Sequence, residues 1–86
     1  MYTIAYNNFV VNRKEGIILD FASRLTNLRN AKGVSQRQIA KDLGCSLLGY
    51  QRYEYNQSHP NIVMLGKIAD YFGVSADYLL GRSDKP

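Results

Sequence analysis

Cysteine and histidine are nearly absent from this sequence, and long apolar runs are missing altogether. One cysteine among 86 residues excludes an internal disulfide and any zinc or iron–sulfur site built from several cysteines. The single histidine stands near no plausible nucleophile, so it does not suggest a hydrolase. No apolar run approaches the roughly 20 residues that span a bilayer, and the N-terminus lacks the pattern of a signal peptide. We therefore expect a cytoplasmic protein without a metal, a cofactor or a membrane association.

The chain is also short and has few acidic residues. Its 86 residues, 45% hydrophobic and 21% charged, fit one globular domain. A chain of this length buries only about 60–65% of its unfolded surface. It therefore lacks room for the layered scaffold of most enzymes, and we do not expect an enzyme. The net charge of +4 favours an anionic partner such as nucleic acid. Most of this excess, +3, lies in residues 20–60, and residues 61–86 are balanced.

Apolar spacing and glycine positions predict an all-α protein of five helices. Phe21, Leu25 and Leu28 recur at helical spacing. Four of the segments with such spacing are followed by a glycine, as is typical where the chain leaves a helix in the left-handed conformation. The expected helices are residues 20–32, 36–43, 46–55 and 62–72, followed by a brief fifth helix that begins after Ser75 and contains Tyr78, Leu79 and Leu80.

Polar residues at the expected helix starts agree with this assignment. Ser35 and Gln38 have the spacing of a capping box, in which each side chain bonds the backbone amide of the other residue. Asn61 and Ser75 are placed to cap the last two helices. Asn56 can take the left-handed conformation that ends the helix before it.

Residues 1–19 follow a different pattern. Two β-prone runs, 2–6 and 9–11, flank a pair of asparagines that suits a tight turn. We interpret this region as either a short β-hairpin or an extended arm, with a second extended piece at 16–19. The expected organisation is thus an N-terminal arm or hairpin at 1–19, a helical domain at 20–82 and a flexible tail at 83–86.

The most informative unit is the pair of helices expected at 36–43 and 46–55. Only the segment Gly44–Ser46 joins them, and two short helices joined by such a turn form a helix-turn-helix. In that arrangement one helix contacts the DNA backbone while the next enters the major groove.

A set of further motifs surrounds this unit: Arg24–Arg29, Lys32–Gln36, Ile39–Ala40, Leu43–Ser46, Arg52–Glu54, Pro60 and Ile68–Gly81. Together they resemble the Xre/Cro-type helix-turn-helix domain of phage and bacterial repressors. The resemblance covers residues 24–81 and implies a compact five-helix repressor-like bundle. It also implies a small transcriptional regulator of repressor type that binds double-stranded DNA, with residues 46–55 in the major groove. Such regulators usually bind a pseudo-palindromic operator as a homodimer.

Chemistry and resemblance together identify candidate site residues. Arg52 can bind guanine O6 and N7 or a phosphate, and the resemblance places Gln36 against a phosphate. Ser46 suits either a base contact or the cap of the third helix. The resemblance also implies a structural ion pair between Arg29 and Glu54. The expected DNA-contacting residues are Gln36, Arg37, Ser46, Leu47, Leu48, Gln51, Arg52, Gln57 and His59.

Two departures from the family pattern support an alternative. Leu47 and Leu48 stand where relatives more often have polar side chains, and the loop 56–59 lacks lysine and arginine. The leucines could contact thymine methyl groups, could bind a protein, or could mark a weak DNA site. The alternative function is therefore a protein-interaction module of the same fold, an antirepressor-like or toxin-neutralising partner that binds through the third helix.

The last helix is the first candidate for dimerisation. We expect no further domain after Gly81, so the interface would use the apolar residues Tyr78, Leu79 and Leu80 or the N-terminal segment. Cys45 lies in the turn, where we expect a buried, inert thiol rather than a redox sensor.

Overall fold

The computed structural model describes residues 13–86, with side chains from Phe21 onward. Every regular element in this part of the chain is helical, as predicted. The elements are α1 (Arg13–Lys32), α2 (Gln36–Leu43), α3 (Leu47–Glu54), α4 (Ile62–Phe72) and α5 (Ala76–Leu79). The β-prone runs at 2–6 and 9–11 lie outside the described residues.

The first helix is longer than predicted. It begins at Arg13, so the extended piece expected at 16–19 is wrong. β-Branching of Ile17 and Ile18 favours a strand only weakly. Because each residue added to an existing helix gains a hydrogen bond, helices propagate through such residues once they are nucleated. The spacing from Ile17 through Phe21 to Leu25 also fits the helical period.

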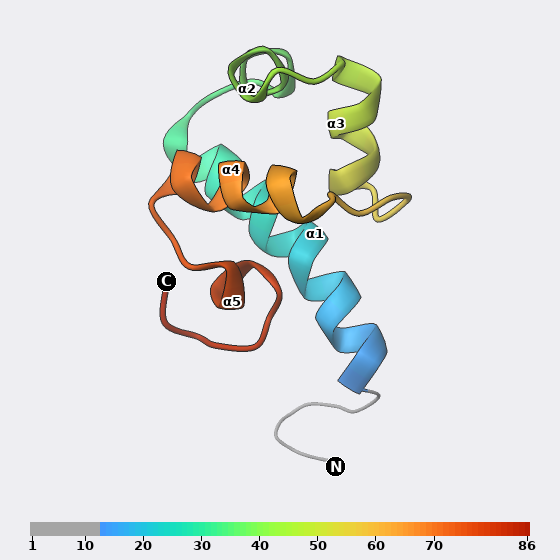
Figure 1. Ribbon diagram of the computed structural model, residues 1–86, viewed down its shortest axis with the longest axis vertical. Helices are drawn as coiled ribbons and strands as arrows, with labels where there is room; N and C mark the ends of the chain where they lie inside the picture. The colour runs from blue at the N-terminus through green and yellow to red at the C-terminus, as the bar shows by residue number, and fades with distance from the viewer. Residues whose placement is uncertain (1–12) are drawn as a thin grey trace.

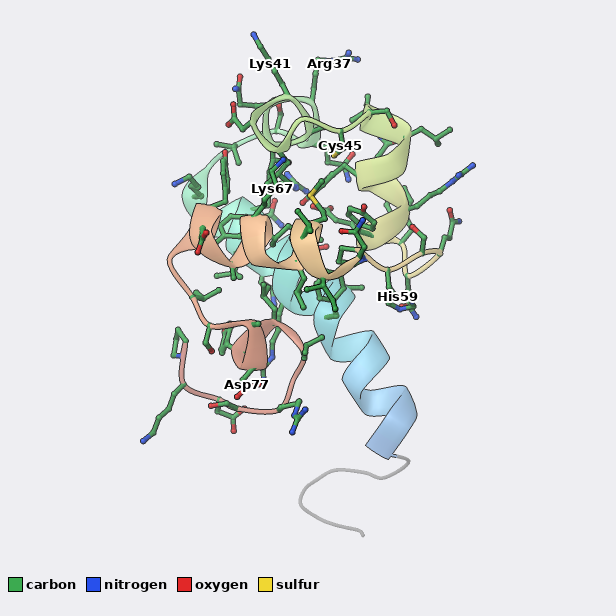
Figure 2. All side chains as sticks on the ribbon, viewed as in Figure 1. Arg37, Lys41, Cys45, His59, Lys67 and Asp77 are labelled. Atoms are coloured by element: carbon green, nitrogen blue, oxygen red, sulfur yellow. The ribbon has the colours of Figure 1, made fainter. Side chains whose placement is uncertain are left out.

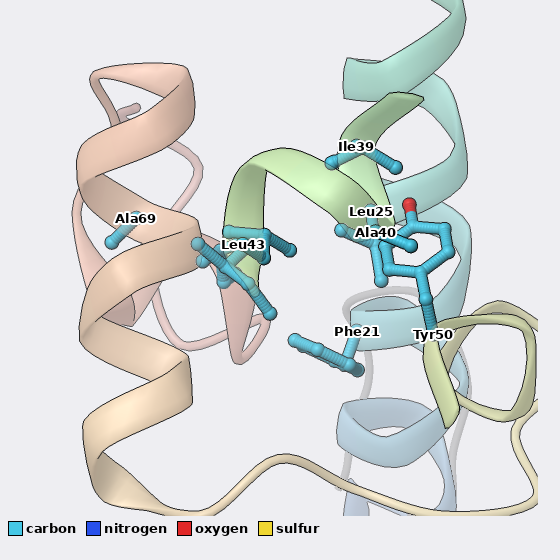
Figure 3. Close-up of a cluster of buried hydrophobic side chains, with 9 residues drawn as sticks. Phe21, Leu25, Ile39, Ala40, Leu43, Tyr50 and Ala69 are labelled. Atoms are coloured by element: carbon cyan, nitrogen blue, oxygen red, sulfur yellow. The ribbon is translucent and has the colours of Figure 1, made fainter. Parts of the chain in front are cut away.

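The helices surround one core, with α2 and α3 at one end of the molecule (Figure 1). In this view α4 crosses α1, and α5 lies on the opposite side of α4 from α2. The five largest fully buried side chains come one from each helix: Leu25, Ile39, Tyr50, Ile68 and Leu79. The close-up in Figure 3 shows part of this cluster. Because every helix contributes to the same core, the position of α3 depends on the whole bundle.

Helix caps hold the turns between these elements. Four N-cap side chains accept a hydrogen bond from the backbone amide three residues later, and they belong to Ser35, Ser46, Asn61 and Ser75. Asn56 has a φ of 59°, the left-handed conformation predicted for it. The reciprocal half of the capping box is wrong, because Gln38 Nε2 donates to Asp42 Oδ1 at 2.8 Å instead. That contact lies one turn ahead on the same helix face, where side chains at i and i+4 meet.

Candidate nucleic-acid interface

A three-residue turn joins α2 to α3. Gly44 ends α2 with a φ of 77°, a conformation that glycine adopts without a Cβ penalty. The Cys45 amide then donates to the Ala40 carbonyl at 3.0 Å, and the Ser46 hydroxyl accepts from the Gly49 amide at 3.0 Å. Ser46 therefore caps α3, which was one of its two expected roles. The turn fixes the crossing of two short helices, as a helix-turn-helix requires.

The outer face of α3 is free of the core. Leu48 is 58% exposed and Tyr55 is 57% exposed, and Arg52 between them is also exposed. Leu47 and Gln51 are half-buried. Leu48, Arg52 and Tyr55 recur at helical spacing. The outer face therefore presents one basic group flanked by an aliphatic and an aromatic side chain.

The inner face of α3 packs against the core. Tyr50 is fully buried, and Tyr53 packs against the core from a half-buried position. Their rings lie 6.3 Å apart between centroids in an edge-to-face arrangement, which is a favourable geometry for aromatic pairs. Both tyrosines therefore face inward, as their spacing predicts.

Glu54 is the acceptor at the centre of a polar network that joins three helices. Arg29 donates from Nε to Oε2 at 2.6 Å and from Nη2 to Oε1 at 3.2 Å. The Tyr50 hydroxyl also donates to Oε2, and Gln36 Nε2 donates to Oε1 at 3.0 Å. The structure thus contains the Arg29–Glu54 ion pair that the resemblance implied. The network around Glu54 ties the end of α3 to α1 through Arg29 and to the start of α2 through Gln36.

The electrostatics of this network favour the charged pair. Burial acts to raise the pKa of the Glu54 carboxyl, but the hydrogen bonds from its three neighbours outweigh burial, so its pKa lies below the ordinary 4.5. The hydrogen bond to Glu54 raises the pKa of Arg29. Burial, reinforced by the hydrogen bond to Glu54, raises the pKa of Tyr50 well above its usual range. A paired carboxylate and guanidinium are therefore the stable forms at neutral pH.

Gln36 and Gln51 belong to the same network, which the sequence did not reveal. Gln36 Oε1 accepts from Gln51 Nε2 at 3.1 Å. Gln36 is thus bonded on both sides of its amide, to Glu54 and to Gln51. The two glutamines stand 15 positions apart on different helices, so no local spacing could pair them.

The remaining candidate residues lie around α3. Figure 2 shows Arg37 and Lys41 pointing away from the body at α2, and both are exposed. Gln57 and His59 are exposed in the loop between α3 and α4. The His59 ring lies 6.5 Å from that of Phe21 between centroids.

Cys45 is half-buried and packs against the core. Burial raises the pKa of its thiol, so the reactive thiolate is disfavoured. In the described residues no three His, Cys, Asp or Glu side chains gather as metal ligands would. Nor does any helix there combine the length and apolar character needed to cross a bilayer.

Helix α5 requires a correction. Leu79 was expected at a dimer interface, but its side chain is fully buried in the protein's own core. Adjacent residues of a helix point about 100° apart, so the three apolar residues cannot all face outward. Tyr78 and Leu80 are half-buried, and the Arg24 guanidinium lies 4.3 Å from the Tyr78 ring centroid.

The comparisons with known proteins agree on one kind of domain. The helix-turn-helix family model matches residues 25–79. The prophage-derived HTH-type transcriptional regulator YonR of Bacillus subtilis is 40% identical over 60 residues, covering 70% of this chain and 56% of that protein. The phage CTXphi transcriptional repressor RstR of Vibrio cholerae is 42% identical over 59 residues, covering 69% and 53%.

A third relative is named as an activator rather than a repressor. The HTH-type transcriptional activator BcrR of Enterococcus faecalis is 32% identical over 66 residues, covering 77% of this chain and 32% of that protein. The chain thus spans about half the length of the first two relatives. All three are named as transcriptional regulators and none as an enzyme.

Proposed function

Because the chain belongs to the Xre-like helix-turn-helix family, we propose that it binds specific double-stranded DNA as a small transcriptional regulator of repressor type. The observation that carries this proposal is the contrast between the two faces of α3. Tyr50 and Glu54 fix the inner face, while Leu48 and Arg52 stand exposed on the outer face. A helix held rigidly with a free outer face is what insertion into the major groove requires.

Each outer residue has a role that suits a groove. Arg52 donates to guanine O6 and N7 or to a phosphate, and Leu48 makes an apolar contact with a thymine methyl. Leu47 and Ser46 lie at the end of α3 nearest the turn, where base edges are read. Arg37 near the start of α2 contacts a phosphate, since its exposed guanidinium extends from the surface. Gln57 and His59 supply further polar contacts from the loop.

We further propose a homodimer that reads a pseudo-palindromic operator. Two copies of α3 spaced by about 34 Å would contact half-sites one DNA turn apart. The name of the Vibrio cholerae relative, a phage transcriptional repressor, supports the repressor type. Since Leu79 is buried, Tyr78 in α5 and Leu80 directly after it remain as candidates for the interface, beside the N-terminal segment.

Selection of bound sequences from random duplexes, at a stated salt concentration, tests the proposal. We expect one base pattern, repeated in inverted orientation at a spacing of about one DNA turn. Arg52→Ala should lower affinity for the selected duplex about tenfold. Arg82→Ala, which removes an exposed arginine beyond α5, is the matched control and should change affinity little.

The salt dependence of binding provides a second readout. The loop 56–59 carries no lysine or arginine, so each subunit makes few phosphate contacts. Each contact contributes about 0.9 to the slope of log affinity against log salt. We expect a shallow dependence, and a slope steeper than about 8 per dimer would contradict this footprint.

The exposed leucine on α3 is also compatible with a second candidate function, the binding of a protein partner. Leu48 and Tyr55 are both more than half exposed, and apolar groups of this kind also suit a protein partner. If diverse duplexes perturb no backbone amide signals from Ser46 to Arg52, the DNA proposal fails. A protein-interaction module that binds through α3 would then account for the exposed side chains.

A further inference from the structure

Two large apolar side chains stand exposed at the start of α4, and together they form the α4 patch. Ile62 is 87% exposed and Val63 is 72% exposed, more than any other large apolar side chain in the described part of the chain. The next two in exposure there, Leu48 and Tyr55, lie on the outer face of α3, which the proposed DNA contact uses. That contact assigns no role to the α4 patch.

The α4 patch continues an apolar stripe that is otherwise buried. Leu65 packs against the core and Ala69 is buried in it. Ile62 precedes these two residues by three and seven positions, which is the spacing of one helix face. Side chains of a helix tilt toward its N-terminus, so the first member of the stripe extends beyond the residues that cover the others. The apolar stripe is therefore longer than the core beneath it, and contiguous exposed apolar surface is typical of a contact site.

The start of α4 is also held at a fixed position relative to α3. The backbone amides of Gln57 and Ser58 donate to the Arg52 carbonyl at 2.8 Å and 3.2 Å, so the loop after α3 folds back onto the end of that helix (Figure 1). Asn61 Oδ1 then accepts from the Met64 amide at 2.8 Å and caps α4. A contact made by the first turn of α4 would therefore also set where the α3 of a partner stands.

The charge pattern around the α4 patch suits a second copy of this chain. Residues 55–66 contain no Lys, Arg, Asp or Glu, and they form the longest such run in the described residues. In a two-fold contact the same surface of both copies meets, so a charged surface would place like charges against each other at a cost. This chain carries a net charge of +4, and an uncharged surface avoids that cost. The same surface offers no cation to a DNA phosphate.

We propose that Ile62 and Val63 form the centre of a two-fold contact between two copies of this chain, and that the contact forms on operator DNA. A stable interface has about 20–30 residues on each side, far more than the α4 patch and its loop provide. The copies should therefore pair only weakly in solution and associate when two half-sites hold them close together. This inference rests on the proposed function, for which it names the dimer contact.

The alternative contact at α5 offers less apolar surface. The Arg24 guanidinium lies 4.3 Å from the centroid of the Tyr78 ring, and Tyr78 is half-buried. Leu80 is half-buried as well. Both residues are thus more covered within their own chain than the α4 patch is.

The first test titrates the unaltered protein onto three duplexes. The first duplex holds one selected half-site, the second holds two in inverted orientation at the selected spacing, and the third adds about five base pairs between them. On the second duplex the second copy should bind about tenfold or more tightly than a copy on the single half-site. Five base pairs turn the second copy to the opposite side of the DNA, so this gain should vanish on the third duplex. A gain that survives the insertion would overturn the contact.

Two double variants test the side chains themselves. Ile62→Ser with Val63→Ser should reduce the gain to about one and leave the affinity for a single half-site unchanged. Because both side chains are exposed, the melting temperature should change little. Ile62→Val with Val63→Ile is the matched control, since it keeps the patch apolar and should keep the gain. If the gain survives in the serine variant, the inference is overturned, and Leu80→Ser then tests the contact at α5.

The outcomes separate this inference from the function on which it rests. If no duplex is bound, the proposed function fails and the inference fails with it. If single half-sites are bound but two half-sites give no gain, DNA binding stands and the contact is overturned. If the serine variant melts normally but loses affinity for a single half-site, the α4 patch touches DNA and its pairing with a second copy is overturned. Should the serine variant not fold, the duplex with the insertion still decides.

Discussion

Two arginines on α1 form ion pairs with different parts of the molecule. The two pairs have similar lengths, but we expect them to contribute differently to stability. Arg29 lies 2.6 Å from Glu54 on α3, and Arg24 lies 2.9 Å from Asp84 in the C-terminal segment. The side chains of the first pair are 14% and 2% exposed, whereas those of the second are 18% and 98% exposed. Because water screens an exposed charge and not a buried one, distance alone does not rank the two pairs.

The two arginines also differ in what they bind. Arg29 directs two of its nitrogens to one carboxylate and donates from the third to a single backbone carbonyl, that of Val34. Arg24 donates to the backbone carbonyls of Tyr78 at 2.8 Å and Ser83 at 2.7 Å. The first arrangement depends on a charge, and the second depends mainly on the shape of the chain after α5. We therefore expect the two regions to respond differently to mutation and to pH.

The largest effect is expected at the buried pair. Arg29→Met leaves the Glu54 carboxylate without its cation and should lower the free energy of unfolding by about 3 kcal/mol. Denaturation by urea, followed by circular dichroism, measures this loss. The double variant Arg29→Met with Glu54→Met should recover much of the stability, since apolar replacement of both partners is often near neutral. A loss below about 1 kcal/mol in the single variant would contradict a buried charge pair.

Acid should weaken the same region next. The folded pKa of Glu54 lies below its ordinary value, so its stabilising contribution is complete above about pH 5 and is lost as the pH falls through the folded pKa. The stability difference between the unaltered protein and Glu54→Gln should therefore shrink from about pH 6 to about pH 3. Asp42, whose pKa is lowered by its hydrogen bond from Tyr71, contributes equally to both proteins and cancels. A difference that stays constant across this range would show that the charge on Glu54 is not what stabilises α3.

Much of the helical framework could be predicted from the sequence because its signals are local. The turn residues Gly44 and Ser46 and the caps Ser35 and Asn61 act on neighbours a few positions away, so spacing identifies them. The exposure of Leu48 follows from the helical period in the same way. The Arg29–Glu54 pair joins two residues that are 25 positions apart in the sequence. It could be predicted only through the family resemblance.

The parts that could not be predicted depend on tertiary packing. Leu79 is buried because α5 turns that side chain toward the shared core, and an apolar triplet does not say which of its members faces inward. The Gln36–Gln51 contact requires α2 and α3 to cross at a particular place. The start of α1 at Arg13 reflects helix propagation, which outweighs the weak strand preference of isoleucine.

A smaller effect is expected at the second arginine. Arg24→Met removes two hydrogen bonds to backbone carbonyls and the contact with the Tyr78 ring, and should cost about 1–2 kcal/mol of stability. Arg24→Lys is the matched control, since it keeps the charge but lacks the planar fork that reaches several acceptors. Thermal melts should place Arg24→Lys near Arg24→Met. Full retention of stability in Arg24→Lys would mean that charge, and not shape, holds the C-terminal segment.

The smallest effect is expected at the partner of that arginine. Asp84→Asn removes one charge of an ion pair but keeps an oxygen that can accept from Arg24 Nη2. Because the Asp84 side chain is 98% exposed, the free energy of unfolding should change by less than about 0.5 kcal/mol. Melts in low and high salt should differ little for this variant. A loss of more than about 1 kcal/mol in the free energy of unfolding would make this ion pair comparable in strength to the buried one. Solvent exposure would then not explain the difference between the two pairs.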